Sequence, residues 1–182
     1  GTTCTMVYHQ VRNEKLWVAH VGDSRAILGK QGVGMRDVED LTIDHKPDLE
    51  EERRRIENSN PPGRVVFDGY YNHRVFALNG MYPGLNMSRA LGDVIGHREA
   101  GLSALPDVKE IDLAAARGEH CGSLPLLLCT DGVWEFIASS EAMSLVSNHD
   151  STQAHAAVQE LAQVSWDRWM EDSNNEISDD IT

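Results

Sequence analysis

The chain has 182 residues, and its 29 acidic against 16 basic side chains leave a formal net charge of −13. A chain of this length suits one domain with a sizeable core, and this charge would repel a nucleic-acid backbone or an anionic membrane surface. The three widely spaced cysteines favour a reducing compartment, and no apolar run is long enough to span a bilayer. We therefore expect an intracellular protein, cytoplasmic or nuclear, without nucleic-acid partners or membrane insertion.

The N-terminal part predicts three strands. Residues 4–11 and 16–21 are rich in Val, Thr, Tyr and Trp and flank a short polar segment, a pattern typical of a hairpin. Apolar residues resume at 26–28, after a turn that contains Asp23. Asp23 therefore lies at a strand end, where a turn-forming role is its simplest interpretation.

A helix is predicted between residues 44 and 60. Glu50 precedes Arg54, and Glu51 precedes Arg55, each at the spacing that favours an ion pair on a helix surface. A Pro- and Gly-rich turn follows, and two further strands are expected over residues 64–67 and 74–78.

Residues 87–106 give weaker signals. Arg89 and Asp93 are spaced so that they could pair across a turn. Residues 96–106, which begin with Gly96, His97 and Arg98, contain many Gly, Ala and Ser and predict a mobile surface loop.

The apolar run Leu126–Leu128 leads through Cys129 and Thr130 into Asp131 and Gly132, which predicts a buried strand that ends on a carboxylate. A carboxylate held rigidly in this way is a natural ligand for a hard divalent cation. An ordinary Asp-Gly turn is an equally good interpretation of this motif by itself.

Two helices are predicted after residue 134. Ser139 and Ser140 are candidate N-caps for a helix that runs to Val146, and Ser151 with Thr152 would cap a longer one. The apolar stripe expected on the longer helix comprises Ala154, Val158, Leu161 and Ser165, with Ala157 and Val164 beside them. Many short strands followed by helices indicate an α+β fold with helices laid over sheets.

Six motifs occur in an order that resembles the metal-dependent protein phosphatases of the 2C type. They are Gly1–Thr3, Val21–Arg25, Leu41–Pro47, Ser88–Asp93, Thr130–Glu135 and Asp179–Thr182. The resemblance implies a β-sandwich of two antiparallel sheets flanked by helices. It also implies a centre of two Mg or Mn ions, with a third, weaker site, and hydrolysis of phosphoserine and phosphothreonine in phosphoprotein substrates.

The resemblance also implies site residues. Asp131 and Asp179 would bind the paired ions, and Asp23 and Glu135 the third ion; Glu135 stands where the family has Asp. Arg89 and Asp93 match the motif beside the family's flap, and the loop that begins with Gly96, His97 and Arg98 would be the flap itself. Paired cations can activate a water for attack on phosphorus, so no protein nucleophile is required. Each of the eight histidines is interpreted as a surface or structural residue, His45 among them.

Two family features are absent from the sequence: an early Asp-Gly-His-Gly-Gly motif, whose Asp bridges the ions, and an earlier Arg that receives the phosphate. We therefore expect residues 1–182 to be one catalytic domain that lacks its N-terminal strands and its last strand, and to be poorly active or inactive alone. A pseudophosphatase that docks a partner and an acidic cation-binding module are the alternatives. The oligomeric state is left open.

Overall fold

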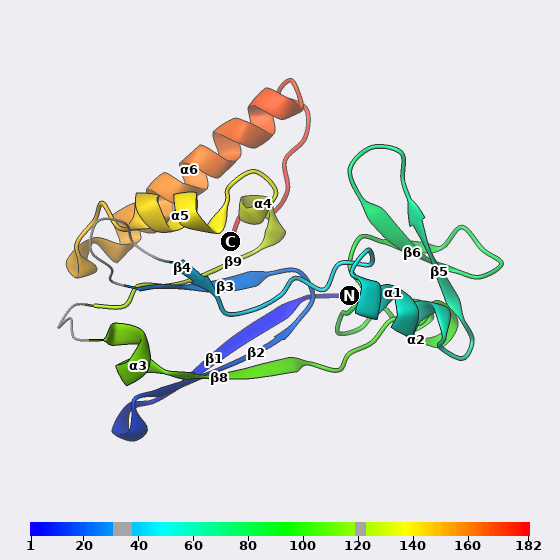
Figure 1. Ribbon diagram of the computed structural model, residues 1–182. Coiled ribbons are helices and arrows are strands. Elements are labelled where there is room, and N and C mark those ends of the chain that lie inside the picture. The colour runs from blue at the N-terminus through cyan, green and yellow to red at the C-terminus, as the bar shows by residue number, and fades with distance from the viewer. Residues whose placement is uncertain (31–37, 119–122) are drawn as a thin grey trace. The chain divides into compact units, whose positions relative to one another are not determined.

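The computed structural model describes residues 1–30, 38–118 and 123–182 (Figure 1). Cys121, one of the three cysteines, lies outside these ranges. The chain divides into two compact units, which are treated separately below. Unit 1 comprises residues 1–6, 19–23 and 43–108, and unit 2 comprises residues 7–18, 24–42 and 109–182.

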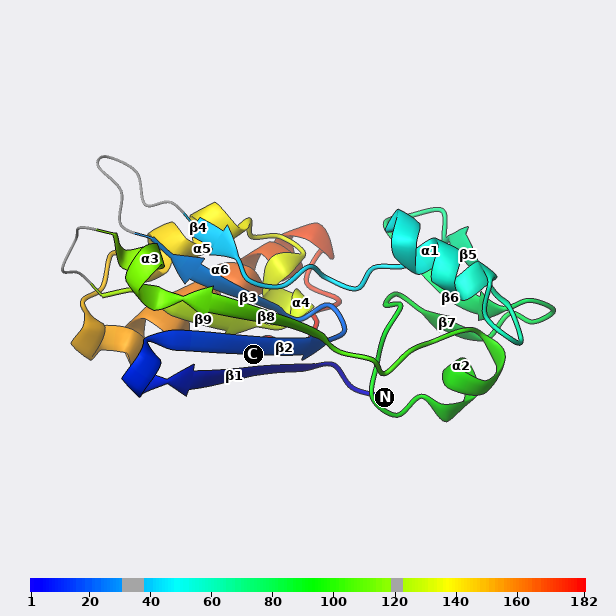
Figure 2. The same ribbon diagram turned by 60° about the horizontal axis from the view of Figure 1, so that its bottom comes forward.

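Two three-stranded sheets are built from strands of both halves of the sequence. The first has the order β1 (Cys4–Gln10), β2 (Lys15–Val21), β8 (Asp107–Asp112), and a short 3-10 turn, Val11–Asn13, connects β1 to β2. The second has the order β4 (Val38–Asp40), β3 (Arg25–Gly29), β9 (Leu126–Cys129), with both pairs antiparallel. Figure 2 shows β1, β2 and β8 side by side. The predicted hairpin and the predicted strands at 26–28 and 126–128 are confirmed.

The side chains of β3 alternate between two cores, as the period of a strand requires. Ala26 and Leu28 pack with Leu16 and Val18 of β2, and Ile111 of β8 belongs to the same cluster. Ile27 packs instead in a cluster that includes residues of α5 (Ser139–Val146) and α6 (Ala154–Asp172). The result is a β-sandwich with helices over one sheet, which confirms the expected α+β class (Figure 1).

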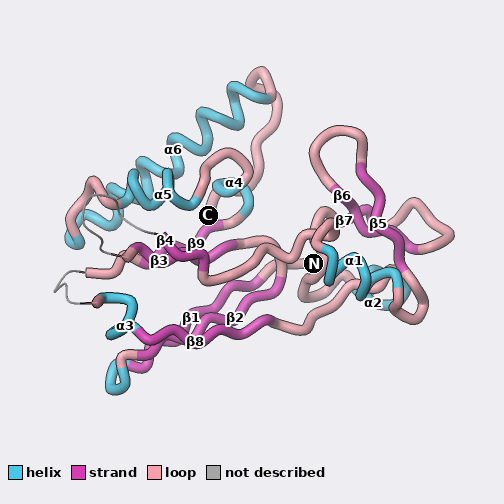
Figure 3. The backbone as a smooth tube through the Cα atoms, viewed as in Figure 1, coloured by secondary structure: helices cyan, strands magenta, loops and turns pink. Residues whose placement is uncertain are grey.

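Unit 1 contains a third sheet with its own small core. The antiparallel order is β5 (Gly63–Phe67), β6 (His73–Ala77), β7 (Pro83–Leu85). α1 (Glu50–Glu57) and α2 (Val94–Glu99) accompany it (Figure 3). The buried cluster comprises Ile56, Val75, Ala77 and Ala100. The predicted helix and both predicted strands of this region are confirmed.

The mobile surface loop predicted at residues 96–106 is wrong in its first half. Val94–Glu99 forms α2, and Ala100 and Leu102 behind it are 0% and 6% exposed. The glycine and alanine content that suggested a loop instead permits close packing, because a Cβ on Gly96 would lie 3.1 Å from Leu102. Small residues here serve tertiary contacts rather than mobility.

Three details of the helices also differ from expectation. Ala138 is the N-cap of α5, and Ser139 is already helical. The cap before α6 is Asp150, which precedes a 3-10 turn at Ser151–Gln153. Along α6 the buried residues are Ala157, Leu161 and Ser165, whereas Val158 is 46% exposed. A short helix, α3 (Leu113–Arg117), follows β8. Within the described ranges, no helix has the length and apolar character needed to cross a bilayer.

Candidate metal centre

Asp131 follows β9 directly and begins a short helix. β9 pairs with β3 along its whole length, with Cys129 opposite Arg25. Thr130 has extended backbone angles, φ −77° and ψ 169°, and α4 (Asp131–Trp134) starts immediately after it. The Asp-Gly pair is therefore the first turn of a helix, not a hairpin turn. Asp131 is held between a paired strand and a helical turn.

The backbone that follows Asp131 is fixed by two other segments of unit 2. The carbonyl oxygen of Gly132 accepts hydrogen bonds from Ser165 Oγ at 2.6 Å and from Trp169 Nε1 at 2.8 Å, both on α6. A Cβ at position 132 would collide with the carbonyl oxygen of Asp180. Only glycine fits this close approach, which explains why the sequence places Gly132 beside the carboxylate.

The C-terminal segment is attached to the end of β9. Thr130 Oγ1 donates to the carbonyl oxygen of Asp180 at 2.8 Å, and Thr130 N donates to the carbonyl oxygen of Thr182 at 3.0 Å. Asp179 precedes these contacts; its side chain is exposed and accepts the backbone N–H of Asp180 at 2.7 Å. Asp131 and Asp179 thus belong to neighbouring segments, although no strand forms at residues 179–182.

Glu135 lies one helical turn after Asp131. Its backbone N–H donates to the carbonyl oxygen of Asp131 at 2.9 Å, and its side chain is exposed. Residues four apart on a helix share a face, so the two carboxylates lie on the same side of this turn. The spacing supports a joint role, and the longer Glu side chain reaches further from the backbone than an Asp would.

Asp23 belongs to unit 1, where it is almost completely buried, with an exposed fraction of 1%. Its Oδ2 accepts a hydrogen bond from the ammonium group of Lys46. Its Oδ1 is buried, and no hydrogen-bond partner for this oxygen is found within the described ranges. The turn before it requires glycine, because Gly22 has a φ of +104° and a Cβ there would overlap Thr3.

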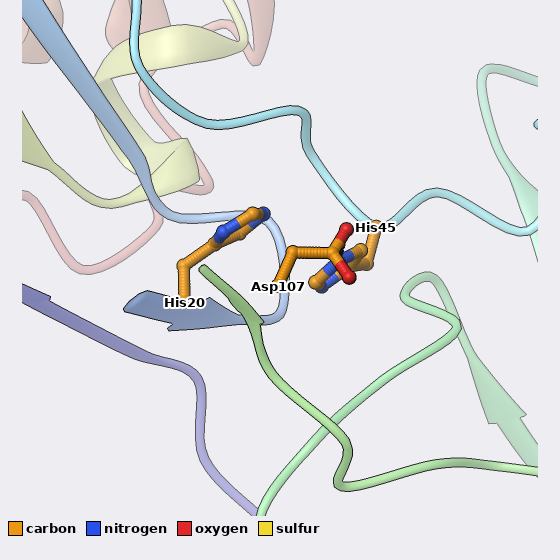
Figure 4. Close-up of side chains that lie close together, drawn as sticks. All are labelled: His20, His45 and Asp107. Atoms are coloured by element: carbon orange, nitrogen blue, oxygen red, sulfur yellow. Dashed lines mark hydrogen bonds and ion pairs between the residues drawn. The ribbon is translucent and has the colours of Figure 1, made fainter. Parts of the chain in front are cut away.

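Another cluster of possible ligands, which the sequence did not reveal, is formed by His20, His45 and Asp107 in unit 1 (Figure 4). One ligand atom from each lies within 4.8 Å of the others. The two imidazole rings are stacked, however, with centroids 4.3 Å apart and planes only 5° from parallel. Nitrogen lone pairs lie in the plane of the ring, so lone pairs in two stacked planes do not converge on one ion.

The hydrogen bonds of these histidines indicate a structural role. His45 Nδ1 accepts the backbone N–H of Gly22 at 3.0 Å, so its Nε2 carries the proton and faces Asp107 Oδ2 at 3.2 Å. His20 Nε2 lies 2.8 Å from the carbonyl oxygen of Ile43. Burial lowers the pKa of His45, which favours the neutral ring. The interpretation of His45 as a structural residue agrees with these contacts.

Arg89 does not pair with Asp93. Its guanidinium group binds the buried carboxylate of Glu52, with Nη2 2.6 Å from Oε1, and Nη1 lies 2.8 Å from Asp107 Oδ1. The Arg89 side chain is 13% exposed. The predicted pairing is wrong because both true partners are distant in sequence, on α1 and at the start of β8.

The other residues predicted near the substrate are spread around α2. Asp93 precedes this helix with a φ of +39° and is the residue at its N-cap. Gly96 is buried, His97 Nε2 lies 3.0 Å from the carbonyl oxygen of Ala90, and Arg98 is exposed. Their proposed role beside the substrate stays a prediction.

The predicted ligands suit a hard divalent cation. All four are carboxylates, the donor type that Mg²⁺ and Mn²⁺ prefer. Asp131, Glu135 and Asp179 are in unit 2, and Asp23 is in unit 1. A buried carboxylate oxygen without a donor, such as Asp23 Oδ1, is costly unless a cation compensates it, so the residues present fit the ions that the resemblance implies.

Comparison with known proteins gives a consistent result. The sequence profile of the family "Protein phosphatase 2C" matches residues 1–174. The chain is 32% identical over 185 residues to "Probable protein phosphatase 2C 73" of Arabidopsis thaliana, with 100% of this chain and 46% of that protein covered. It is 34% identical over 155 residues to human "Protein phosphatase 1G", with 81% of this chain and 24% of that protein covered.

Solved structures agree on the fold. A serine-threonine phosphatase 2C from Toxoplasma gondii matches with a TM-score of 0.73 and 24% identity, over 92% of this chain and 52% of that one. A sex determining protein of C. elegans matches with a TM-score of 0.70 and 24% identity, over 98% of this chain and 38% of that one. The chain spans about half the length of the Arabidopsis relative. Together with the six motifs and their placement in the fold, these matches show that the chain belongs to the protein phosphatase 2C family.

Proposed function

We propose that the protein carrying this chain hydrolyses phosphoserine and phosphothreonine in other proteins and depends on Mg²⁺ or Mn²⁺ for this activity. The observation that carries the proposal is the fixed position of Asp131, between β9 and α4 and beside the segment that contains Asp179. Membership of a protein phosphatase family supports it.

Each acidic residue has a defined part in this proposal. Asp131 and Asp179 would hold the paired ions. Asp131 directly follows β9, and the residue after Asp179 is hydrogen-bonded through its carbonyl to Thr130 at the end of that strand. Asp23 and Glu135 are the residues that the family resemblance assigns to the third ion. When bound, such ions supply an activated water and neutralise the charge of the phosphoryl group.

The compartment is part of the same proposal. Cys4 and Cys129 are free thiols, and burial raises the pKa of Cys129 to about 12, so this thiol is unreactive. These features support an intracellular protein, cytoplasmic or nuclear, that acts on phosphoprotein substrates.

The test is Mn²⁺-dependent release of phosphate from a phosphothreonine peptide by the full-length product of the gene. Asp131→Asn and Asp179→Asn should each lower the rate by about 100-fold or more, on the scale seen when a group that acts directly in catalysis is removed. Asp180→Asn is the matched control, because this neighbour contacts Thr130 through its backbone carbonyl and should keep its activity.

A calorimetric titration with Mn²⁺ accompanies the assay. A folded protein that releases no phosphate would contradict the enzyme proposal and favour the partner-docking alternative. Full activity in Asp131→Asn would contradict the assignment of the ligands.

A further inference from the structure

Asp23 has an unusual environment for a carboxylate. The side chain is 1% exposed, and its Oδ2 is bound by the ammonium of Lys46, whose own side chain is 24% exposed. Oδ1 is closed off from bulk water, and in the part of the chain that the structure describes nothing donates a hydrogen bond to it. A buried carboxylate is costly unless its charge is compensated, and Oδ1 is the oxygen that Lys46 leaves available for a cation.

Two hydrogen bonds between the preceding residues, Gly22 and His45, hold Asp23 and Lys46 next to each other. His45 N donates to the carbonyl oxygen of Gly22 at 3.0 Å, and His45 Nδ1 accepts the N–H of Gly22 at 3.0 Å. These two bonds join the residue before Asp23 to the residue before Lys46. The ion pair is therefore set by the fold and is not an incidental surface contact.

We propose that Lys46 is an internal competitor that weakens cation binding at Asp23. The inference rests on the proposed function, which assigns Asp23 to the third ion. One oxygen of the carboxylate serves the ammonium and leaves the other for a divalent cation. The two positive groups then share one negative charge at short range, and their repulsion lowers the affinity for the cation.

The arrangement has a second consequence for the protein without metal. The ammonium of Lys46 is then the cation that compensates buried Asp23, so the loop is stable before an ion binds. When Lys46 loses its charge, that task passes entirely to the divalent cation. Stability should then depend more strongly on Mn²⁺, because a ligand that binds only the folded state stabilises it.

The experiment measures Mn²⁺ affinity by the electron paramagnetic resonance signal of free Mn²⁺, and the thermal midpoint with and without Mn²⁺, on the full-length product of the gene. The single variants are Lys46→Met, Lys46→Gln, Lys46→Arg and Asp23→Asn, and a double variant combines Lys46→Met with Asp23→Asn. Lys109→Met is the matched control, because Lys109 is a half-exposed lysine that pairs with Glu39 instead.

The Lys46→Met variant should bind Mn²⁺ at its weakest site about tenfold more tightly than the wild type does, within the usual range of coupling between two sites. Mn²⁺ should also raise its thermal midpoint by more than it raises that of the wild type. Lys46→Gln keeps a hydrogen-bond donor for Oδ2 without the charge, so it should behave likewise even where the Met variant folds poorly. Lys46→Arg should keep the low affinity. The double variant should bind Mn²⁺ as Asp23→Asn alone does, because the carboxylate for which Lys46 competes is then gone.

A wrong role for Lys46 and a wrong assignment of Asp23 would give different results. Unchanged or weaker Mn²⁺ binding in both neutral variants, with Asp23→Asn clearly impaired, would overturn the role of Lys46 and leave Asp23 as a ligand. Unchanged Mn²⁺ binding in Asp23→Asn would overturn the assignment of Asp23 and this inference with it. Neither result depends on phosphate release, which Asp131→Asn tests separately.

Discussion

At the scale of single residues, Glu52 on α1 is a buried side chain with several hydrogen-bond donors around it. Its carboxylate accepts hydrogen bonds from Arg89, from Arg55 Nη2 at 2.8 Å and from Ser88 Oγ at 2.6 Å. Burial by itself raises the pKa of Glu52, but these three donors outweigh it and lower the pKa from 4.5 to about 2. Ionised Glu52 therefore stabilises the folded state.

This depressed pKa predicts how stability depends on pH. The stabilisation is fully present above pH 4.5, the pKa of the unfolded chain, and is lost as the pH falls towards about 2. Glu52→Gln should lower the free energy of unfolding by about 3 kcal/mol at pH 7, because it leaves Arg89 with a weaker partner. Urea unfolding between pH 2.5 and 7 should show a flatter pH dependence for this variant than for the wild type.

The control for this prediction is Glu51→Gln, an exposed neighbour on the same helix. It should leave the pH dependence unchanged. Parallel curves for Glu52→Gln and the wild type would show that Glu52 ionises in the folded protein as it does in the unfolded chain.

Local pattern predicted some site residues and missed others. Asp131 was predictable because an apolar run leads straight into it. The partners of Arg89 were not, because Glu52 and Asp107 lie 37 and 18 residues away and only the fold brings them together. Lys46 lies inside a matched motif but was given no role from the sequence, because its contact with Asp23 spans 23 residues and needed the structure.

At the scale of elements, the start of the C-terminal helix shows how closely spaced cap residues mislead a sequence interpretation. Asp150, Ser151 and Thr152 are all good N-caps in adjacent positions. The structure selects Asp150, whose Oδ1 accepts the N–H of Thr152 at 2.8 Å, while Gln153 Oε1 accepts the N–H of Asp150 at 3.2 Å. This reciprocal pair sets the cap at Asp150, one residue before Ser151 and Thr152, the caps proposed from the sequence.

Removal of this cap should have a measurable cost. Asp150→Ala should lower the free energy of unfolding by about 1 kcal/mol, the typical cost of losing an N-cap. Ser151→Ala should change it by less than about 0.5 kcal/mol, as is usual for a surface position without a special contact. Thermal unfolding measures this loss of stability in both variants. An equal loss of stability in the two variants would mean that Asp150 is not the cap.

At the scale of the whole molecule, the two units differ in the size of their cores. Among the residues that the structure describes, unit 2 holds two buried clusters, one of nine residues and one of seven, whereas the cluster in unit 1 has four. The apolar residues 26–28 predicted a strand, but not that its side chains would pack into both of these clusters. The third sheet could be predicted only as separate strands, because the small residues that pack against it, such as Ala100, look like loop residues in the sequence.

This difference predicts unequal local stability. Backbone amides of β6 should exchange with solvent at a lower free energy of opening than those of β3, because fewer buried contacts must be broken to expose them. Hydrogen exchange followed by nuclear magnetic resonance measures both sets in one sample. Equal free energies for β3 and β6 would mean that the chain opens as one cooperative unit.

Two indole rings lie against the backbone of the turn that carries Asp131. Trp134 Nε1 donates to the carbonyl oxygen of Cys129 at 2.8 Å, and Trp169 Nε1 donates to that of Gly132 at the same distance. The protein therefore has an optical reporter at its candidate metal centre. Paramagnetic Mn²⁺ bound near Asp131 would quench the emission of these rings, whereas Trp17 and Trp166, at 38% and 46% exposed, supply the solvent-facing background.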